Sequence, residues 1–346
     1  MSRMLDEIRQ QPEALERTLQ GELPRVERFR QLIARRKPRF VVLAARGTSD
    51  NAAQFGRYLL EITTGIPVSL AAPSVHTLYG SKIDYHDALL VAISQSGEST
   101  DINSVLEAAR KQGAITLAIT NEPKSTMSRL ADHVWLVRAG KEKSVAATKT
   151  YSSQLMLMYL LAYALGGRIR LSELQKIPES AASALQLEPE IAVLSERYRF
   201  MEYAVVVGRG LNYANALEFA LKLMETCYVV AERFSSADFF HGPIALIERN
   251  FPGFLFAPSG VTWASMQELA ARMKSLHAET IIVTDRKNTE AAGAGTRLIC
   301  LPERLNELYS AIPYIIPAQL FAASLAAQKG LDPDRPRTLS KITKTM

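Results

Sequence analysis

The hydroxyl-rich stretch Ser94-Gln95-Ser96-Gly97-Glu98-Ser99 decides how the fold of this chain is interpreted. It directly follows the apolar run from Ala88 to Ile93, and it directly precedes Thr100 to Leu106, in which the apolar residues have helical spacing. The sequence therefore predicts a turn that joins the carboxyl end of a buried strand to the N-terminus of a helix.

Such a turn is suited to binding an anion. Backbone N–H groups without helical partners and the positive end of the helix dipole converge at this point. The hydroxyls of Ser94, Ser96 and Ser99 add donors that can surround a phosphate without a competing charge. The spacing and the lysine of a Walker loop are missing, so nucleotide hydrolysis is not expected. An ordinary serine-rich helix cap is the alternative interpretation.

The bulk composition agrees with a globular protein of two domains. The chain has 346 residues, of which 47% are hydrophobic, enough to fill two cores. The two cysteines, Cys227 and Cys300, are too few for a disulfide framework and favour a reducing cytoplasm. The longest apolar run, Leu155 to Leu165, is too short to span a bilayer, so we expect a buried helix and no membrane association.

The net charge of +6 suits an anionic substrate. Lysine and arginine are nevertheless scattered along the chain and mixed with acidic residues. Since no basic tract and no alternation of basic with aromatic residues is present, a nucleic-acid partner is not expected.

Strand-like runs alternate with helical ones along the whole chain. Two amphipathic helices, Met4 to Leu19 and Glu27 to Arg35, are expected before the first strand. The expected strands are Phe40 to Ala45, Ala88 to Ile93, Ile115 to Thr120, His133 to Val137, Tyr203 to Val207, Phe254 to Ala257, Thr280 to Val283 and Leu298 to Leu301. Such alternation predicts parallel sheets that are covered by helices on both faces.

The two halves look internally related. Val41 to Gly47 and Ala204 to Gly210 are each a strand that runs into an Arg-Gly turn, which a duplicated α/β unit explains. The alternative is that any parallel α/β protein has several such junctions. The predicted division is a helical segment (1–36), a first domain (37–168), a linker (169–195), a second domain (196–331) and a C-terminal tail (332–346).

The second half contains residues suited to acid–base chemistry. The helix-forming stretch Ala214 to Tyr228 places Glu218, Lys222 and Glu225 on one helical face. Because the rest of this helix is largely apolar, the face can border a cleft in which a carboxyl pKa moves toward the working pH. A solvated ladder of ion pairs is the alternative.

A histidine follows downstream in Phe239-Phe240-His241-Gly242-Pro243. A lone histidine is more often structural, but rigid neighbours on both sides would fix the orientation of His241 for proton transfer. The remaining histidines show no metal-ligand spacing and are interpreted as structural or surface residues: His76, His86, His133 and His277.

Together these motifs resemble the sugar isomerase (SIS) family, which binds phosphosugars. Three further blocks match its isomerase and deaminase branch: Ala45 to Ser49, Ser144 to Lys149, and Gly208 to Leu246. The chain is similar to the isomerase half of glucosamine-6-phosphate synthase and, more closely, to stand-alone SIS-type glucosamine-6-phosphate deaminases. The resemblance implies two tandem doubly wound parallel-sheet domains of the flavodoxin-like, three-layer α/β/α type, with an N-terminal helical extension and a C-terminal active-site tail.

The resemblance also implies roles for individual residues. Glu225 matches the base that moves a proton between C1 and C2, and Glu218 and Lys222 match its supporting ion pair. His241 matches the acid/base that opens the sugar ring, which in the family comes from the neighbouring subunit of a homodimer. Lys341 matches the tail lysine at the carbonyl end of the sugar. The implied substrate-binding positions are Arg46, Thr48, Ser49, Ser94, Gln95, Ser96, Ser99, Val145, Ala147 and Ser340.

Two positions depart from the synthase pattern. Arg46 stands where the synthase has a cysteine and adds a positive charge beside the expected phosphate site, whereas Ala147 replaces a serine and removes a hydroxyl contact. The chain begins Met1-Ser2-Arg3 without a nucleophile domain, so we do not expect it to release ammonia from glutamine by itself.

The implied reaction converts glucosamine 6-phosphate and water to fructose 6-phosphate and ammonia, without a metal or organic cofactor. Three alternatives stay open: another isomerase or deglycase of amino-sugar or fructosamine 6-phosphates, an isomerase subunit that lacks its glutaminase, and a phosphosugar-binding regulator. The acid–base set argues against a regulator, because a sensor needs the phosphate loop alone.

Overall fold

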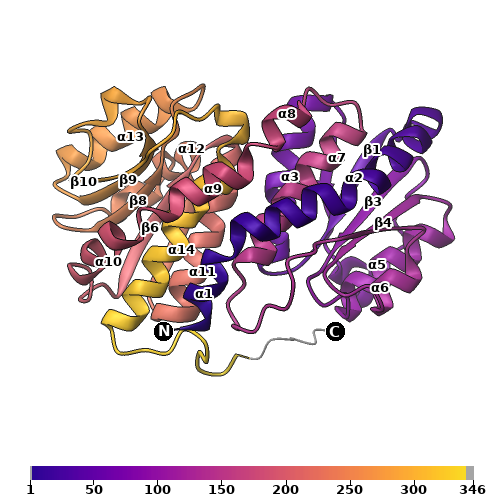
Figure 1. Cartoon of the computed structure of the whole chain (residues 1–346), viewed down its shortest axis with the longest axis horizontal. Helices are drawn as coiled ribbons and strands as arrows, with labels where there is room; N and C mark the ends of the chain where they lie inside the picture. The colour runs from indigo at the N-terminus through magenta and orange to yellow at the C-terminus, as the bar shows by residue number, and fades with distance from the viewer. Residues whose placement is uncertain (1, 340–346) are drawn as a thin grey trace. The chain divides into compact units, whose positions relative to one another are not determined.

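The structure is a computed structural model that describes residues 2–339, and the chain divides into two compact units. What we call the first unit comprises residues 13–142 and 149–175. The second unit comprises residues 2–12, 143–148 and 176–339. Each unit contains one sheet, and the two are described separately below (Figure 1).

The N-terminal helices differ from the prediction. The chain forms α1 (Arg3–Arg9) and then one long helix, α2 (Gln11–Arg36), so the predicted break after Leu19 is wrong. Gly21 and Pro24 are residues that favour a helix break, but α2 continues through Pro24. Buried Val26, Phe29 and Ile33 continue the apolar stripe of α2 beyond the proline, and their burial stabilises the helix across it.

The first unit is a five-stranded parallel sheet with the order β2-β1-β3-β4-β5. Its strands are β1 (Phe40–Ala44), β2 (Val68–Leu70), β3 (Ala88–Ile93), β4 (Ile115–Thr120) and β5 (His133–Leu136). Its further helices are α3 (Thr48–Thr64), α4 (Ser74–Thr77), α5 (Thr100–Lys111), α6 (Thr126–Leu130), α7 (Lys149–Ala164) and α8 (Leu171–Leu174).

Helices cover both faces of this sheet. On one face, Ile102, Val105 and Leu106 of α5 share a core with Val42 and Leu90 of the sheet. On the other face, α3 and α7 pack together, and Gly56 of α3 lies against Met158 of α7 and Leu43 of β1. The first unit therefore has three layers, and the long apolar run of α7 is a buried helix as predicted.

The second unit repeats this topology with the strand order β10-β9-β8-β6-β7, again parallel throughout. Its strands are β6 (Tyr203–Gly208), β7 (Val230–Ser235), β8 (Pro252–Phe256), β9 (Glu279–Asp285) and β10 (Arg297–Leu301). Since β7-β6-β8-β9-β10 corresponds to β2-β1-β3-β4-β5, the predicted pair of doubly wound parallel sheets is confirmed.

Besides α1, the α-helices of the second unit are α9 (Ile177–Leu185), α10 (Glu188–Glu196), α11 (Tyr213–Cys227), α12 (Ser236–Phe240), α13 (Trp263–Ser275) and α14 (Ala311–Gln328). Short 3₁₀ turns occupy Gly210–Asn212, Pro243–Leu246, Thr289–Ala291 and Glu307–Tyr309. Residues 169–195 include α8, α9 and most of α10, while the predicted domain and linker boundaries stay predictions.

Helix α14 alone among the described helices is long and apolar enough to cross a membrane by length and composition. However, 83% of it is buried, and it packs against α9, α10 and α11 in its own unit (Figure 1). Its hydrophobicity is that of a core helix.

Candidate functional site

The hydroxyl-rich turn lies where the sequence predicted it, between β3 and α5. The Ser94 N–H donates to the carbonyl of Ile119, and the Gly97 carbonyl accepts from the Met127 N–H. Gly97 has a φ of +66°, and a Cβ at this position would lie 2.2 Å from Ser125 Oγ. Only glycine fits here, so the turn is tightly determined.

The serine hydroxyls of this turn differ in their contacts. Ser94 Oγ accepts a hydrogen bond from the Gly97 N–H at 3.1 Å and lies 3.3 Å from Ser99 Oγ. Ser96 Oγ accepts from the Glu98 N–H at 3.3 Å. Ser99 is the N-cap residue of α5, but its side chain makes no capping hydrogen bond. Because the helix does not use this hydroxyl, the ordinary-cap interpretation loses its main support, and anion binding at the turn stays a prediction.

A second loop ends at the same edge of the sheet. It follows β1, which pairs directly with β3, and it contains Arg46 before α3 begins at Thr48. Arg46 Nε donates to Asp101 Oδ2 of α5 at 2.7 Å. Ser49 is buried and its hydroxyl accepts from Gln154 Nε2, so this predicted substrate contact already has a structural partner.

A cavity of about 370 Å³ adjoins the turn, with Gln95, Ser96 and Glu98 in its wall. The cationic residues that line it are Lys124 and Lys141. The carboxylates of Glu98, Glu122 and Glu142 line it as well, so the cavity beside the predicted phosphate loop is polar and carries charges of both signs.

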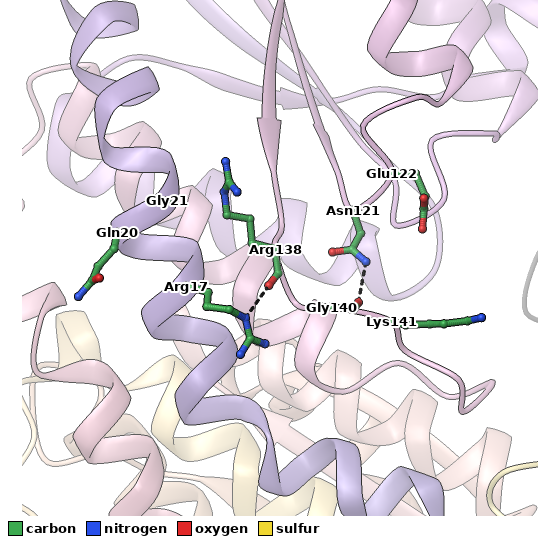
Figure 2. A pocket seen from close by; sticks show the side chains of 8 residues that line it. All are labelled: Arg17, Gln20, Gly21, Asn121, Glu122, Arg138, Gly140 and Lys141. Carbon is green, nitrogen blue, oxygen red and sulfur yellow. Dashed lines mark hydrogen bonds between the residues drawn. The ribbon is translucent and has the colours of Figure 1, made fainter.

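A larger cavity of about 930 Å³ lies in the same unit and is shown in Figure 2. It is lined by Arg17, Gln20 and Gly21 of α2 and by Asn121, Glu122, Arg138, Gly140 and Lys141 from the segments that follow β4 and β5. Asn121 Nδ2 donates to the Gly140 carbonyl at 2.8 Å and braces these two segments together. None of the residues that the sequence predicted for the substrate site lines this cavity.

The second unit contains a buried triad on α11. Lys222 Nζ donates to Glu225 Oε2 at 2.5 Å and lies 3.3 Å from Glu218 Oε1. The side chains of Glu218 and Lys222 are 0% exposed, whereas that of Glu225 is 21% exposed. The predicted three-residue face therefore exists, and it is not a solvated ladder of ion pairs.

The charge of Lys222 is maintained by its partners. Burial by itself lowers the pKa of the ammonium, but the charges of Glu218 and Glu225 and their hydrogen bonds outweigh it and raise the pKa above its ordinary value. Lys222 is therefore a permanent cation that holds the partly accessible Glu225 carboxylate in one orientation. A carboxylate held in this way can accept a proton from a carbon next to a carbonyl or imine group.

His241 ends the short helix α12, which begins at its cap Ser235. The His241 N–H donates to the Asp238 carbonyl, and its side chain is exposed. Within the described part of the chain, no hydrogen bond joins its imidazole to the α11 triad. Its role in ring opening remains a prediction.

The segment with Val145 and Ala147 belongs to the second unit. The carboxylate of Glu7 in α1 shapes it by accepting the N–H groups of Lys143 at 2.5 Å and Ser144 at 3.1 Å. Sequence reasoning did not identify Glu7, because its partners are backbone groups far along the chain.

The predicted tail residues Ser340 and Lys341 lie outside the described residues. The chain that leads to them is anchored near the triad helix. The Arg337 N–H donates to the Tyr228 hydroxyl at 2.8 Å, and its guanidinium lies 3.8 Å from the centroid of that ring. Tyr228 is the C-cap residue of α11. Among residues 2–339, no group of three or more His, Cys, Asp or Glu side chains could hold a metal ion.

Two doubly wound parallel sheets with the same strand order define a duplicated α/β protein. The SIS domain model matches residues 34–164 and 202–329, and the chain therefore belongs to the SIS domain family.

Named relatives carry the comparison further. The chain is 34% identical over 345 residues to a glutamine–fructose-6-phosphate aminotransferase (isomerizing) of Pyrococcus horikoshii, covering 98% of this chain and 57% of that protein. It thus spans little more than half the length of this relative.

Among solved structures, the chain is similar to the C-terminal domain of glucosamine-fructose-6-phosphate aminotransferase from Francisella tularensis. The TM-score is 0.88 at 29% identity, over 97% of this chain and 98% of that one. A glucosamine-6-phosphate deaminase from Thermotoga maritima has a TM-score of 0.77 at 22% identity, over 99% of this chain and 100% of that one. At that identity the likeness shows the fold alone.

Proposed function

We propose that this chain is a phosphosugar isomerase that deaminates glucosamine 6-phosphate to fructose 6-phosphate and ammonia. The observation that carries the proposal is the α11 triad, in which the buried Lys222 ammonium orients the partly accessible carboxylate of Glu225. The likeness to the isomerizing aminotransferase supports a sugar-phosphate substrate, and the intact acid–base set supports an enzyme over a binding module.

The proposed reaction has three steps. His241 opens the sugar ring, which gives the C1 aldehyde of the amino sugar. Glu225 then removes the proton from C2 while O1 takes up a proton, which gives an enolamine. Return of a proton to C1 and loss of one N–H proton leave a hydroxymethyl group at C1 and an imine at C2. Water adds to the C2 imine, and ammonia leaves as the C2 ketone of fructose 6-phosphate forms.

The hydroxyl-rich turn after β3 is assigned to the 6-phosphate. Ser96 and Ser99 present hydroxyls at the N-terminus of α5, where the helix dipole favours negative charge. In this assignment the phosphate fixes one end of the substrate, so that proton transfer at C1 and C2 gains from positioning.

One other function is favoured by a specific observation. The similarity to an isomerizing aminotransferase, of which this chain spans 57%, also fits an isomerase subunit that obtains ammonia from a partner. The two functions share the same proton transfer and differ in direction. Ammonia release from glucosamine 6-phosphate by the purified chain alone supports the deaminase. Turnover of neither glucosamine 6-phosphate nor fructose 6-phosphate with free ammonium supports a subunit that needs ammonia delivered by its partner.

We further propose a homodimer in which His241 completes the site of the neighbouring subunit. An inactive Glu225→Gln chain mixed with an inactive His241→Ala chain should then regain part of the activity, because one site of the heterodimer holds both native groups. No recovery despite demonstrated subunit exchange would show that each chain is self-contained.

The two free thiols, Cys227 and Cys300, fit a cytoplasmic location.

A further inference from the structure

The two loops that follow β1 and β3 border the switch point of the first sheet. From β1 the chain proceeds to β2 on one side, whereas β3 pairs with the other side of β1. In open parallel sheets, ligands bind in the crevice that such diverging loops leave at the carboxyl ends of the strands. Within residues 45–47 and 94–99, the one cationic side chain is that of Arg46.

Arg46 is held by one edge of its guanidinium. Its Nε donates to Asp101 Oδ2 at 2.7 Å, with Asp101 2% exposed and Arg46 51% exposed. No residue in 2–339 accepts a hydrogen bond from the terminal amino groups of Arg46. An arginine carries five N–H donors, so four remain available for a ligand.

A structural arginine of the same chain behaves differently. Arg9 donates to Glu188 from Nε at 2.9 Å and from Nη2 at 2.5 Å. This is the bidentate geometry of an arginine–carboxylate pair. Asp101 engages Arg46 through a single donor. The ion pair therefore orients the Arg46 guanidinium and leaves its terminal amino groups available for a ligand.

The surroundings of Arg46 also favour an anion. Arg46 precedes α3, and Asp101 lies in the first turn of α5, so the guanidinium is near the positive ends of two helix dipoles. This is an unfavourable place for a cation, and burial of the Asp101 carboxylate is costly as well. An anionic ligand bound between the loops offsets the first of these costs, because its charge attracts the guanidinium.

We propose that Asp101 is a positioning residue that directs the terminal amino groups of Arg46 onto the phosphate of a sugar phosphate bound at the Ser94–Ser99 turn. The inference rests on the proposed function for the assignment of that turn. It adds a guanidinium to the hydroxyls and backbone N–H groups of the turn, and it makes the doubly ionised phosphate monoester the preferred ligand.

Asp50 provides a matched control. It lies in the first turn of α3, and its side chain is exposed. Desolvation by the surrounding protein raises the pKa of its carboxyl, while the charge of Arg46 acts in the opposite direction. Asp50 is thus a second carboxylate that interacts electrostatically with Arg46, without the hydrogen bond that Asp101 accepts.

The experiment measures the dissociation constants of inorganic phosphate and fructose 6-phosphate by calorimetric titration. Arg46→Gln should weaken both by tenfold or more, and Asp101→Asn should weaken both several-fold. The double variant Arg46→Gln/Asp101→Asn should bind no more weakly than Arg46→Gln alone, because Asp101 acts through Arg46. Asp50→Asn should bind phosphate as tightly as the native chain or more tightly.

Simple electrostatics gives the opposite result for one variant. If Asp101 acted only by its negative charge, Asp101→Asn would tighten phosphate binding as Asp50→Asn does, and this outcome would overturn the proposal. Unchanged phosphate affinity in Arg46→Gln would overturn it as well. Should Asp101→Asn fail to fold, Arg46→Lys decides the question: it keeps the charge but loses the Nε anchor, so native affinity in this variant contradicts positioning.

The binding measurement needs no turnover, which separates the two proposals. If the native chain released no ammonia from glucosamine 6-phosphate but Arg46→Gln bound phosphate more weakly, the proposed deamination would fail and this inference would stand. If the native chain released ammonia but Arg46→Gln bound phosphate with native affinity, the proposed deamination would stand and this inference would fail.

Discussion

The Lys222 ammonium donates a 2.5 Å hydrogen bond to Glu225, three residues further along α11, and neither Lys222 nor Glu218 on its other side is exposed to solvent. The Glu225 carboxylate retains partial access to solvent, so the cluster is buried at Glu218 and Lys222 and accessible at Glu225. A general base needs this combination of fixed orientation and access.

Replacing Lys222 should destabilise the second unit. Lys222→Met leaves two carboxylates without their shared cation, and breaking a buried ion pair in this way costs about 3–5 kcal/mol. Since 1 kcal/mol shifts Tm by about 2–4 °C in a domain of this size, thermal unfolding should begin roughly 10 °C lower. Lys111→Met, which removes an exposed partner of Glu107, is the matched control and should change Tm little. Equal Tm values for the two variants would contradict the account.

The phosphate loop can be tested without disturbing the fold. Ser96→Ala/Ser99→Ala removes hydroxyls that contribute little to the loop, because Ser99 makes no capping bond and the Ser96 bond is long. KM for the phosphorylated sugar should rise at least tenfold while Tm changes by no more than a few degrees. The control is Ser104→Ala, which removes an exposed hydroxyl of the same helix that, within residues 2–339, bonds to the Thr100 carbonyl alone. An unchanged KM in the double variant would refute the assignment of the phosphate.

The anchoring of the C-terminal segment predicts a local change. Tyr228→Phe removes the acceptor of the Arg337 N–H but keeps the ring beneath the guanidinium. Hydrogen exchange at the Arg337 amide should therefore accelerate, whereas amides inside α11 should exchange as before. Tyr228→Leu, which also removes the ring, should accelerate it further. If both variants left the exchange of this amide unchanged, the contact would not hold the segment.

The two thiols should react slowly with alkylating agents in the native protein. Burial raises the pKa of Cys227 to about 11, and burial also raises the pKa of Cys300. Because a raised pKa leaves less of each thiol as the reactive thiolate, iodoacetamide should modify both more slowly than a free thiol at pH 8. Cys227 should react more slowly than half-buried Cys300, and both rates should rise with pH and on unfolding. Native Cys227 that reacts as fast as the unfolded chain would contradict this.

The strands that the sequence predicted best are those buried on both faces. Ala88 to Ile93 and Ile115 to Thr120 have the predicted bounds because a central strand of a parallel sheet is an unbroken apolar run. The edge strands β2 and β7 were missed. The first has only three residues, and the second exposes Glu232 and Arg233 to solvent, so neither has an apolar run to detect.

The candidate site was predictable where it is local in the sequence. The serine turn and the triad of α11 follow from residue spacing along a strand–turn–helix and one helical face. Asp101 was missed because its partner Arg46 lies 55 residues earlier, and an acid in the first turn of a helix is otherwise explained by the helix dipole. Glu7 was missed for a similar reason, since it binds backbone groups more than 130 residues away.

The most direct test of the central claim is an assay of ammonia and fructose 6-phosphate from glucosamine 6-phosphate without glutamine, with native and Glu225→Gln chains compared. The native chain should release the two products in equal amounts. Glu225→Gln keeps the size and polarity of the side chain but removes the base, so turnover should fall about 100-fold or more while fructose 6-phosphate still binds. Near-native turnover in Glu225→Gln would contradict the account.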